Sequence, residues 1–310
     1  MIRPKALHQG ATIGVVSPSY WLDEETLDKG ITWLENHGYQ LLLGESVRAR
    51  RDIFAGSPEL RANDIMSMFC NKDVDAIFCA RGGYGANRVV PLLDYDTIRN
   101  HPKIFMGFSD VTTILNSLAQ RANLISFHGP MIASFGRHPN DYDLKQLQSV
   151  LGGDVDVIVD DLEDCTALTL RDGVAKAEIV GGNLSLINER LGTADQIDCD
   201  NKILLIEEVG EKLYAFERMM LHLKNSGSLN KVKGLIFGEM TEMSDTDVPF
   251  GKTIDEIILD ICEDCLVPII SNFPAGHGAY ISTLPIGHEV TLVANKDERY
   301  IKLVDSPVIK

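Results

Sequence analysis

The sequence has little positive charge. Its 310 residues contain 29 Lys and Arg against 45 Asp and Glu, a formal net charge of -16. Proteins bind nucleic acids and anionic membrane surfaces largely through Lys and Arg, so we expect neither as a partner. Hydrophobic residues nevertheless make up 45% of the chain, which is enough to bury a sizeable core.

Long apolar runs and a disulfide-type cysteine pattern are also missing. No stretch approaches the roughly 18 apolar residues of a membrane span. Residues 1–19 lack the basic start, long apolar centre and cleavage site of a signal peptide, so we expect a cytoplasmic protein. Cys262 and Cys265 have CxxC spacing, but no second pair or nearby His completes a zinc site. Reduced thiols on a helix face are therefore expected.

The first half alternates short apolar segments with helix-like segments. The apolar segments, which we expect to be strands, are residues 12–16, 39–43, 75–80 and 103–106. A helix is expected over residues 23–37, and Ser57 followed by Pro58 is typical of a helix start. This alternation predicts an α/β fold, with a parallel sheet covered by helices on both faces. Ligands of such sheets bind beyond the carboxyl ends of the strands.

A polar, acidic stretch between residues 137 and 166 separates the two halves. It predicts an N-terminal domain over residues 1–160 and a C-terminal domain over residues 161–310. In the second half, strands are expected at residues 174–180, 202–206, 232–237, 267–270 and 289–293, and helices at 211–224 and 254–262.

Ser109 is the candidate nucleophile. The apolar segment before it ends at Gly107, and a helix-like stretch follows, which is the strand–turn–helix context of a nucleophile elbow. The amide of Asp110, at the start of that helix, could stabilise an oxyanion. The second glycine of G-x-S-x-G is missing, and a serine that merely caps a helix would produce the same pattern.

A glycine-rich loop runs from Arg81 through Gly82, Gly83 and Tyr84 to Gly85. Glycines let a backbone approach a ligand closely and expose its N–H groups. The loop is neither G-x-G-x-x-G nor a P-loop, so nucleotide binding is poorly supported. An oxyanion-donor or carboxylate-binding loop fits better, with Arg81 as a charge partner. A tight turn that needs positive φ is the structural alternative.

A serine nucleophile needs a base and an acid that orients the base. His277 lies in a loop flanked by glycines, and His128, at the end of an apolar segment, is its rival. Glu207 follows an apolar strand, where a carboxylate has few structural explanations other than capping a helix; Glu208 and Glu211 compete with it. The chain order Ser, Glu, His is that of α/β-hydrolases.

These motifs belong to eight segments spread over almost the whole chain: residues 12–19, 54–57, 81–85, 107–112, 127–131, 181–184, 207–211 and 274–278. In this order they resemble the LD-carboxypeptidases (muramoyltetrapeptide carboxypeptidases), a serine-peptidase family that also includes the microcin C self-immunity peptidases. One departure follows Glu211. A Pro-rich or aromatic stretch with Arg after Tyr would be expected there, but this chain has Lys212-Leu213-Tyr214-Ala215.

The resemblance implies a catalytic triad of Ser109, Glu207 and His277, split between the two domains. The amides of Gly83 and Asp110 would correspond to the oxyanion hole. Substrate contacts would come from the glycine-rich loop, through Arg81, Gly82 and Tyr84.

The resemblance also implies an N-terminal α/β domain, a smaller β-rich C-terminal domain and a homodimer. The expected reaction releases terminal D-Ala from a murein tetrapeptide, by hydrolysis at the L-centre of a diamino acid, in cytoplasmic peptidoglycan recycling. A serine hydrolase needs no metal or other cofactor. Two alternatives remain open: an immunity peptidase that hydrolyses peptidyl-nucleotide toxins, and a non-catalytic small-molecule binding protein.

Overall fold

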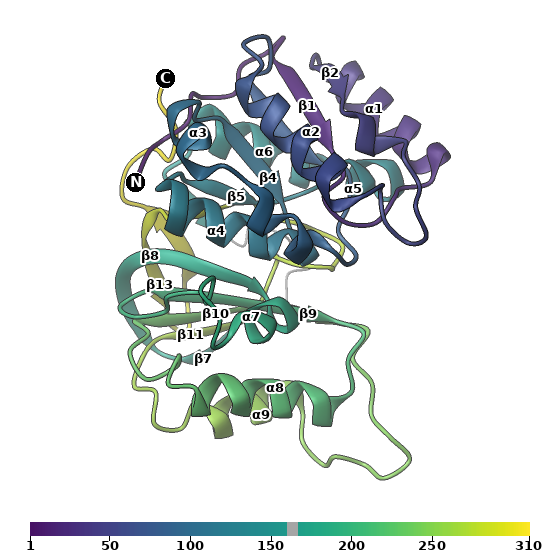
Figure 1. Cartoon of the computed structure of the whole chain (residues 1–310). Helices are drawn as coiled ribbons and strands as arrows, with labels where there is room; N and C mark the ends of the chain where they lie inside the picture. Colours follow the sequence, from purple (N-terminus) through teal and green to yellow (C-terminus); the bar gives the residue numbers. More distant parts are fainter. Residues whose placement is uncertain (160–166) are drawn as a thin grey trace. The chain divides into compact units, whose positions relative to one another are not determined.

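The computed structural model describes residues 1–159 and 167–310 (Figure 1). These residues form two compact units. Unit 1 comprises Met1–Val155, Ser282–Gly287 and Ser306–Lys310, and unit 2 comprises Asp156–Ile281 and His288–Asp305. The domain boundary predicted at residues 160 and 161 lies outside the described residues, as does Cys165.

Unit 1 contains a six-stranded sheet in the order β12-β5-β4-β3-β1-β2. Five neighbouring strands run parallel, and only β12 is antiparallel to its neighbour β5. The strands are β1 (Thr12–Val16), β2 (Gln40–Leu43), β3 (Ala76–Cys79), β4 (Ile104–Gly107), β5 (Ser126–His128) and β12 (Leu284–Ile286). Every residue of β3 and β4 is buried, as expected for the apolar central strands of a sheet covered on both faces.

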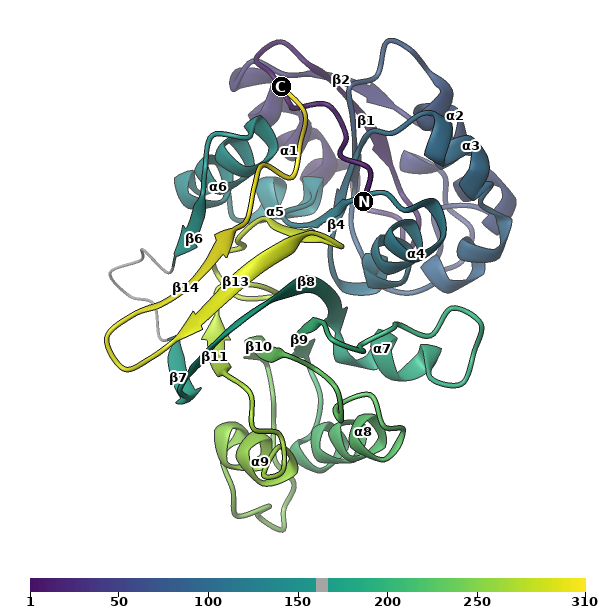
Figure 2. The same ribbon diagram turned by 90° about the vertical axis from the view of Figure 1, so that its left-hand side faces the viewer.

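Helices cover both faces of this sheet. In Figure 2, α1, α5 and α6 lie on one side, and α2, α3 and α4 lie on the other. Their bounds are α1 (Glu24–Asn36), α2 (Pro58–Cys70), α3 (Tyr95–Asn100), α4 (Thr112–Ala122), α5 (Ile132–Arg137) and α6 (Asp141–Gly152). Ser57 caps α2 as predicted, because its side chain accepts a hydrogen bond from the Leu60 amide.

The strand order creates a switch point in unit 1. β1 lies between the next two strands of the chain: β2 pairs with one edge of β1, and β3 pairs with the opposite edge. In open α/β sheets, ligands bind at such a point, beyond the carboxyl ends of the strands. The loops that follow β1, β3 and β4 emerge at this edge.

Unit 2 contains an eight-stranded sheet in the order β6-β14-β13-β8-β9-β10-β11-β7. Strands β8 to β11 are parallel, and the flanking strands pair antiparallel. The strands are β6 (Val157–Val159), β7 (Leu168–Arg171), β8 (Gly173–Asn183), β9 (Ile203–Val209), β10 (Gly234–Thr241), β11 (Ile269–Phe273), β13 (Glu289–Ala294) and β14 (Arg299–Leu303). The helices are α7 (Leu184–Arg190), α8 (Leu213–Asn225) and α9 (Ile254–Ile261).

The core of unit 2 is formed by the parallel strands and these helices. Phe216 of α8, Phe237 of β10 and Ile258 of α9 are completely buried within one hydrophobic cluster. The predicted fold class is confirmed: a parallel-sheet α/β unit is followed by a β-rich unit. Across residues 1–159 and 167–310, no helix combines the length and the apolar character needed to cross a bilayer.

Candidate active site

Ser109 lies on a strained turn at the carboxyl end of β4. Its φ of 63° falls in the left-handed region, which residues other than glycine seldom adopt. An N-cap serine would instead have an extended backbone. A short 3₁₀ turn, Ser109–Val111, then leads into α4. Backbone strain of this kind collects at functional sites, where the surrounding structure maintains it.

Glycines before and beside this serine make the turn possible. A Cβ on Gly107 would lie 3.0 Å from Val111 Cγ1 and 3.2 Å from Cys79 Cβ. A Cβ on Gly82 would lie 2.9 Å from the Cβ of Ser109 and 3.0 Å from its Oγ. The glycine-rich loop after β3 therefore packs directly against the hydroxyl group of Ser109.

The same loop adopts backbone conformations that favour glycine. Gly83 has a φ of 119°, and a Cβ there would lie 2.5 Å from the Tyr20 ring. Arg81 faces the same ring, with its guanidinium carbon 5.5 Å from the ring centroid, and burial lowers its pKa. Tyr84 is 42% exposed, and its ring centroid lies 6.1 Å from that of Phe54.

The Asp110 side chain links three loops at this sheet edge. It is buried and accepts hydrogen bonds from Ser19 Oγ at 2.5 Å and from the Ala86 amide at 2.8 Å. Burial raises the pKa of Asp110, and these hydrogen bonds oppose the increase. The sequence pattern pointed only to the amide of Asp110, and the contact with Ser19 was not predicted. The position of Ser19 just after β1, at the switch point, was the available signal.

On the expectation that Ser109 is the nucleophile, we predict that Gly82→Ala lowers kcat/KM by about 10²-fold, because the new Cβ displaces the Ser109 hydroxyl. Gly82 is not among the glycines with positive φ, so alanine adds no backbone strain there, and any fall in melting temperature comes from the new contact with Ser109. Steady-state kinetics and thermal unfolding test this. Gly152→Ala is the matched control, because its Cβ would approach the flexible side chain of Asp154 at 3.2 Å and the Leu7 carbonyl oxygen at an ordinary contact distance of 3.8 Å. Equal kinetics for the two variants would contradict the prediction.

In unit 2, His277 and Glu207 form a hydrogen-bonded pair. The distance between His277 Nδ1 and Glu207 Oε2 is 2.7 Å. Glu207 lies on β9 with no exposed surface, and His277 follows β11. A Cβ on Gly276 would lie 2.8 Å from Glu207 Oε2, so a glycine there lets the loop approach the carboxylate. An ionised carboxylate only accepts hydrogen bonds, so Nδ1 carries the proton and Nε2 the basic lone pair.

Glu207 also changes the acid–base chemistry of His277. Burial of the imidazole disfavours its positive form and lowers the pKa of His277, but the charges of nearby glutamates and the hydrogen bond to Glu207 together raise it, with Glu207 contributing most. Glu208 and Glu242 contribute in the same direction. The pair thus has the arrangement of a general base with its orienting acid.

Glu208 makes different contacts, because successive strand residues point to opposite faces of a sheet. Its carboxylate accepts hydrogen bonds from Asn183 Nδ2 at 2.9 Å and from the Ser185 amide and hydroxyl at 2.8 and 2.7 Å. It anchors the start of α7, whereas Glu207 contacts the imidazole. Glu211 lies beyond the end of β9 and is half-buried.

His128, the rival base, lies in unit 1 on β5 and is completely buried. Its ring centroid lies 5.7 Å from that of Phe108, the residue before Ser109. Ser109 and the glycine-rich loop therefore share unit 1 with His128, whereas Glu207 and His277 belong to unit 2.

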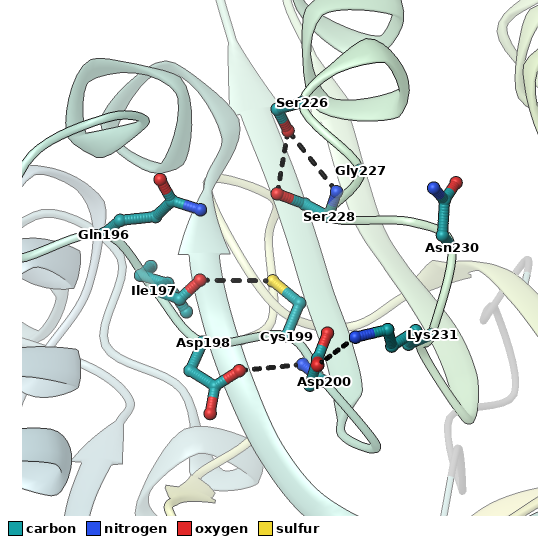
Figure 3. A pocket seen from close by; sticks show the side chains of 10 residues that line it. All are labelled: Gln196, Ile197, Asp198, Cys199, Asp200, Ser226, Gly227, Ser228, Asn230 and Lys231. Atoms are coloured by element: carbon teal, nitrogen blue, oxygen red, sulfur yellow. Dashed lines mark hydrogen bonds and ion pairs between the residues drawn. The ribbon is translucent and has the colours of Figure 1, made fainter.

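A polar pocket of about 330 Å³ lies in unit 2, near the amino ends of β9 and β10 (Figure 3). Its lining comes from the segments before β9 and β10, whereas Glu207 and His277 lie toward the carboxyl ends of the parallel strands. Asp200 pairs with Lys231 there at 2.7 Å, and the Ser226 and Ser228 hydroxyls share a hydrogen bond of 2.8 Å. None of the predicted site residues lines this pocket.

Comparisons with known proteins identify the family. Residues 13–129 match the LD-carboxypeptidase N-terminal domain, and residues 176–292 match the LD-carboxypeptidase C-terminal domain. A probable murein peptide carboxypeptidase from Bacillus subtilis is 31% identical over 296 residues, which cover 94% of this chain and 91% of that protein.

Two solved structures share the fold. Microcin C7 self immunity protein MccF superposes with a TM-score of 0.92 at 23% identity, covering 99% of each chain. The muramoyltetrapeptide carboxypeptidase from Oxalobacter formigenes superposes with a TM-score of 0.85 at 26% identity, covering 96% of this chain and all of that one. On these matches, the chain is a carboxypeptidase and belongs to the LD-carboxypeptidase family of peptidases.

Proposed function

We propose that the protein is a serine-type LD-carboxypeptidase that releases terminal D-Ala from murein tetrapeptides in cytoplasmic peptidoglycan recycling. The observation that carries this proposal is the 2.7 Å hydrogen bond between His277 and buried Glu207. The strained backbone of Ser109 supports the assignment of this serine as the nucleophile. The substrate is proposed from the similarity to the muramoyltetrapeptide carboxypeptidase of Oxalobacter formigenes.

In the proposed reaction, the Ser109 hydroxyl attacks the carbonyl carbon before D-Ala while His277 Nε2 takes its proton. Glu207 holds the imidazole and stabilises its positive form. The amides of Gly83 and Asp110 donate hydrogen bonds to the oxyanion; losing one such donor costs about 3–4 kcal/mol in known enzymes. His277 then protonates the nitrogen of D-Ala, which leaves, and water hydrolyses the acyl-enzyme.

Substrate binding is assigned in this proposal to the glycine-rich loop. Arg81 would contribute positive charge for the terminal carboxylate, while Gly82 and Tyr84 would line the approach to Ser109. Tyr84 is exposed enough to contact a ligand.

The direct test uses synthetic murein tetrapeptides with either lysine or diaminopimelate at the third position. Mass spectrometry should detect the tripeptide and free D-Ala, and a matched peptide ending in L-Ala should remain intact. Absence of cleavage of both tetrapeptides, or cleavage of a peptidyl-nucleotide only, would contradict the proposed substrate.

We predict that kcat/KM increases with pH along a limb whose midpoint lies above 6.5, the usual pKa of histidine. The reason is that His277 accepts a proton only in its neutral form, and its pKa is raised. A pH–rate profile between pH 5 and 9 measures the midpoint. A midpoint below 6.5, the usual pKa of histidine, would argue against His277 as the base.

A further inference from the structure

Cys262 and Cys265 come together on the turn that follows α9. Cys262 is the C-cap residue of α9, and the Cys265 amide donates a hydrogen bond to the Cys262 carbonyl at 3.0 Å. The pair therefore lies on this turn and not on the helix face expected from the sequence. An i to i+3 hydrogen bond of this kind defines a β-turn, whose end Cα atoms lie within about 7 Å. Disulfides span about 4.4–6.8 Å between Cα atoms, so the turn suits one.

The two thiols differ in exposure. Both are free; Cys262 is completely buried in the hydrophobic core of unit 2, whereas Cys265 is half-buried. A hydrogen bond from the Cys262 thiol lowers the pKa of Cys265, and the nearby charges of Lys224 and Arg171 act in the same direction. The same hydrogen bond, together with burial, raises the pKa of Cys262. Cys265 is thus the thiol that ionises first and that solvent can reach.

Arg171 holds the turn in place. Its Nη1 donates hydrogen bonds to the carbonyl oxygens of both Cys262 and Cys265. Arg171 ends β7, which pairs with β11 at Ile269, so the turn is tied to the edge of the sheet. By contrast, burial raises the pKa of Cys79 and Cys199.

We propose that Cys262 and Cys265 form a redox-active dithiol that reacts with low-molecular-weight disulfides and closes an intramolecular disulfide. The Cys265 thiolate attacks one sulfur of the small disulfide, whose S–S bond breaks and releases one thiolate. Cys262 then loses its proton to solvent and attacks the Cys265 sulfur, which releases the second small thiolate. Two electrons pass from the protein to the small disulfide, which is reduced to two thiols.

The test uses oxidised glutathione on the full-length native protein, followed by alkylation and peptide mapping by mass spectrometry. The peptide that contains both cysteines should lose about 2 Da, the mass of two hydrogen atoms, without retaining glutathione. Cys70→Ser is the matched control, because Cys70 is exposed and separate from this turn; it should leave the closure unchanged. Cys262→Ser should stop the reaction with one glutathione on Cys265, and Cys265→Ser should leave Cys262 unmodified.

Stable glutathione on wild-type Cys265, or no reaction of either thiol, would overturn the proposal. Cys262 is buried, so the serine variant could fail to fold, and Cys262→Ala then takes its place. A second measurement needs no variant. One equivalent of phenylarsine oxide, which bridges neighbouring thiols, should protect both Cys262 and Cys265 from alkylation in the wild type. Unprotected thiols would also overturn the proposal, and neither measurement depends on carboxypeptidase activity.

Discussion

Ser109→Ala is expected to lower kcat/KM for D-Ala release by about 10⁴-fold or more. The variant keeps the proposed oxyanion donors and the Glu207–His277 pair but loses the proposed nucleophile, and removal of a triad serine has effects of this size in serine peptidases. Release of D-Ala from the tetrapeptide, followed by chiral chromatography, measures the loss. The variant should also fail to accumulate an acyl-enzyme, which mass spectrometry of the intact protein would detect.

Folding has to be separated from chemistry in this experiment. Ser67→Ala is a suitable control, because the Ser67 hydroxyl donates a local hydrogen bond to the Asp64 carbonyl within α2. It should retain wild-type kinetics. Alanine keeps the Cβ that makes a positive φ unfavourable, so the substitution leaves the backbone strain unchanged and the melting temperature should stay close to that of the wild type. Unchanged D-Ala release in Ser109→Ala would exclude the proposed mechanism and favour a non-catalytic role for this serine.

Glu207→Gln is expected to lower kcat/KM by about 10³- to 10⁴-fold. Glutamine has nearly the same shape, but its amide N–H₂ can donate to His277 Nδ1 and so place the imidazole proton on Nε2. In that tautomer, Nε2 cannot take the proton of Ser109. An equivalent carboxylate-to-amide change in a serine protease triad has an effect of this size.

The pKa of His277 provides a second measurement on this variant. Burial of the ring lowers the pKa of His277, and the negative charge of Glu207 raises it. Removing that charge should therefore lower the pKa, which NMR titration of the imidazole would measure. Glu211→Gln is the control. Glu211 is half-buried, and its backbone carbonyl accepts a hydrogen bond from the Ser244 amide, which a change of side chain leaves in place. A wild-type rate and an unshifted pKa in Glu207→Gln would refute the role given to Glu207.

Strands and helices of unit 1 were predictable because their signals are local. Residues 12–16 and 103–106 are short apolar runs that a sheet covered on both faces requires, and β1 and β4 match them within one residue. The start of α2 was readable from Ser57 and Pro58, because capping involves only neighbours in the chain. The tight turn at Ser109 was indicated in the same way, by the glycine two residues before it.

Features that depend on distant segments were not predictable from local sequence signals. β12 has only three residues, including Pro285, and it exists because it pairs with β5 about 160 residues earlier. Either Glu207 or Glu208 could have been the partner of His277. The outcome depends on which face of β9 lies against the loop after β11, and the local sequence around the two residues does not determine that face. The Glu207–His277 contact joins residues 70 positions apart, and it was expected only because of the family resemblance.

The path of the backbone has a consequence for biosynthesis. It leaves unit 1 after Val155, returns at Ser282, leaves again after Gly287 and comes back at Ser306. A ribosome that has made only the first 155 residues has therefore not yet produced the strand that borders β5, whose edge stays uncovered while unit 2 is translated. Exposed strand edges invite intermolecular pairing, so the nascent polypeptide should be most prone to aggregate during this interval. For the same reason, no single cut in the gene would yield unit 1 intact.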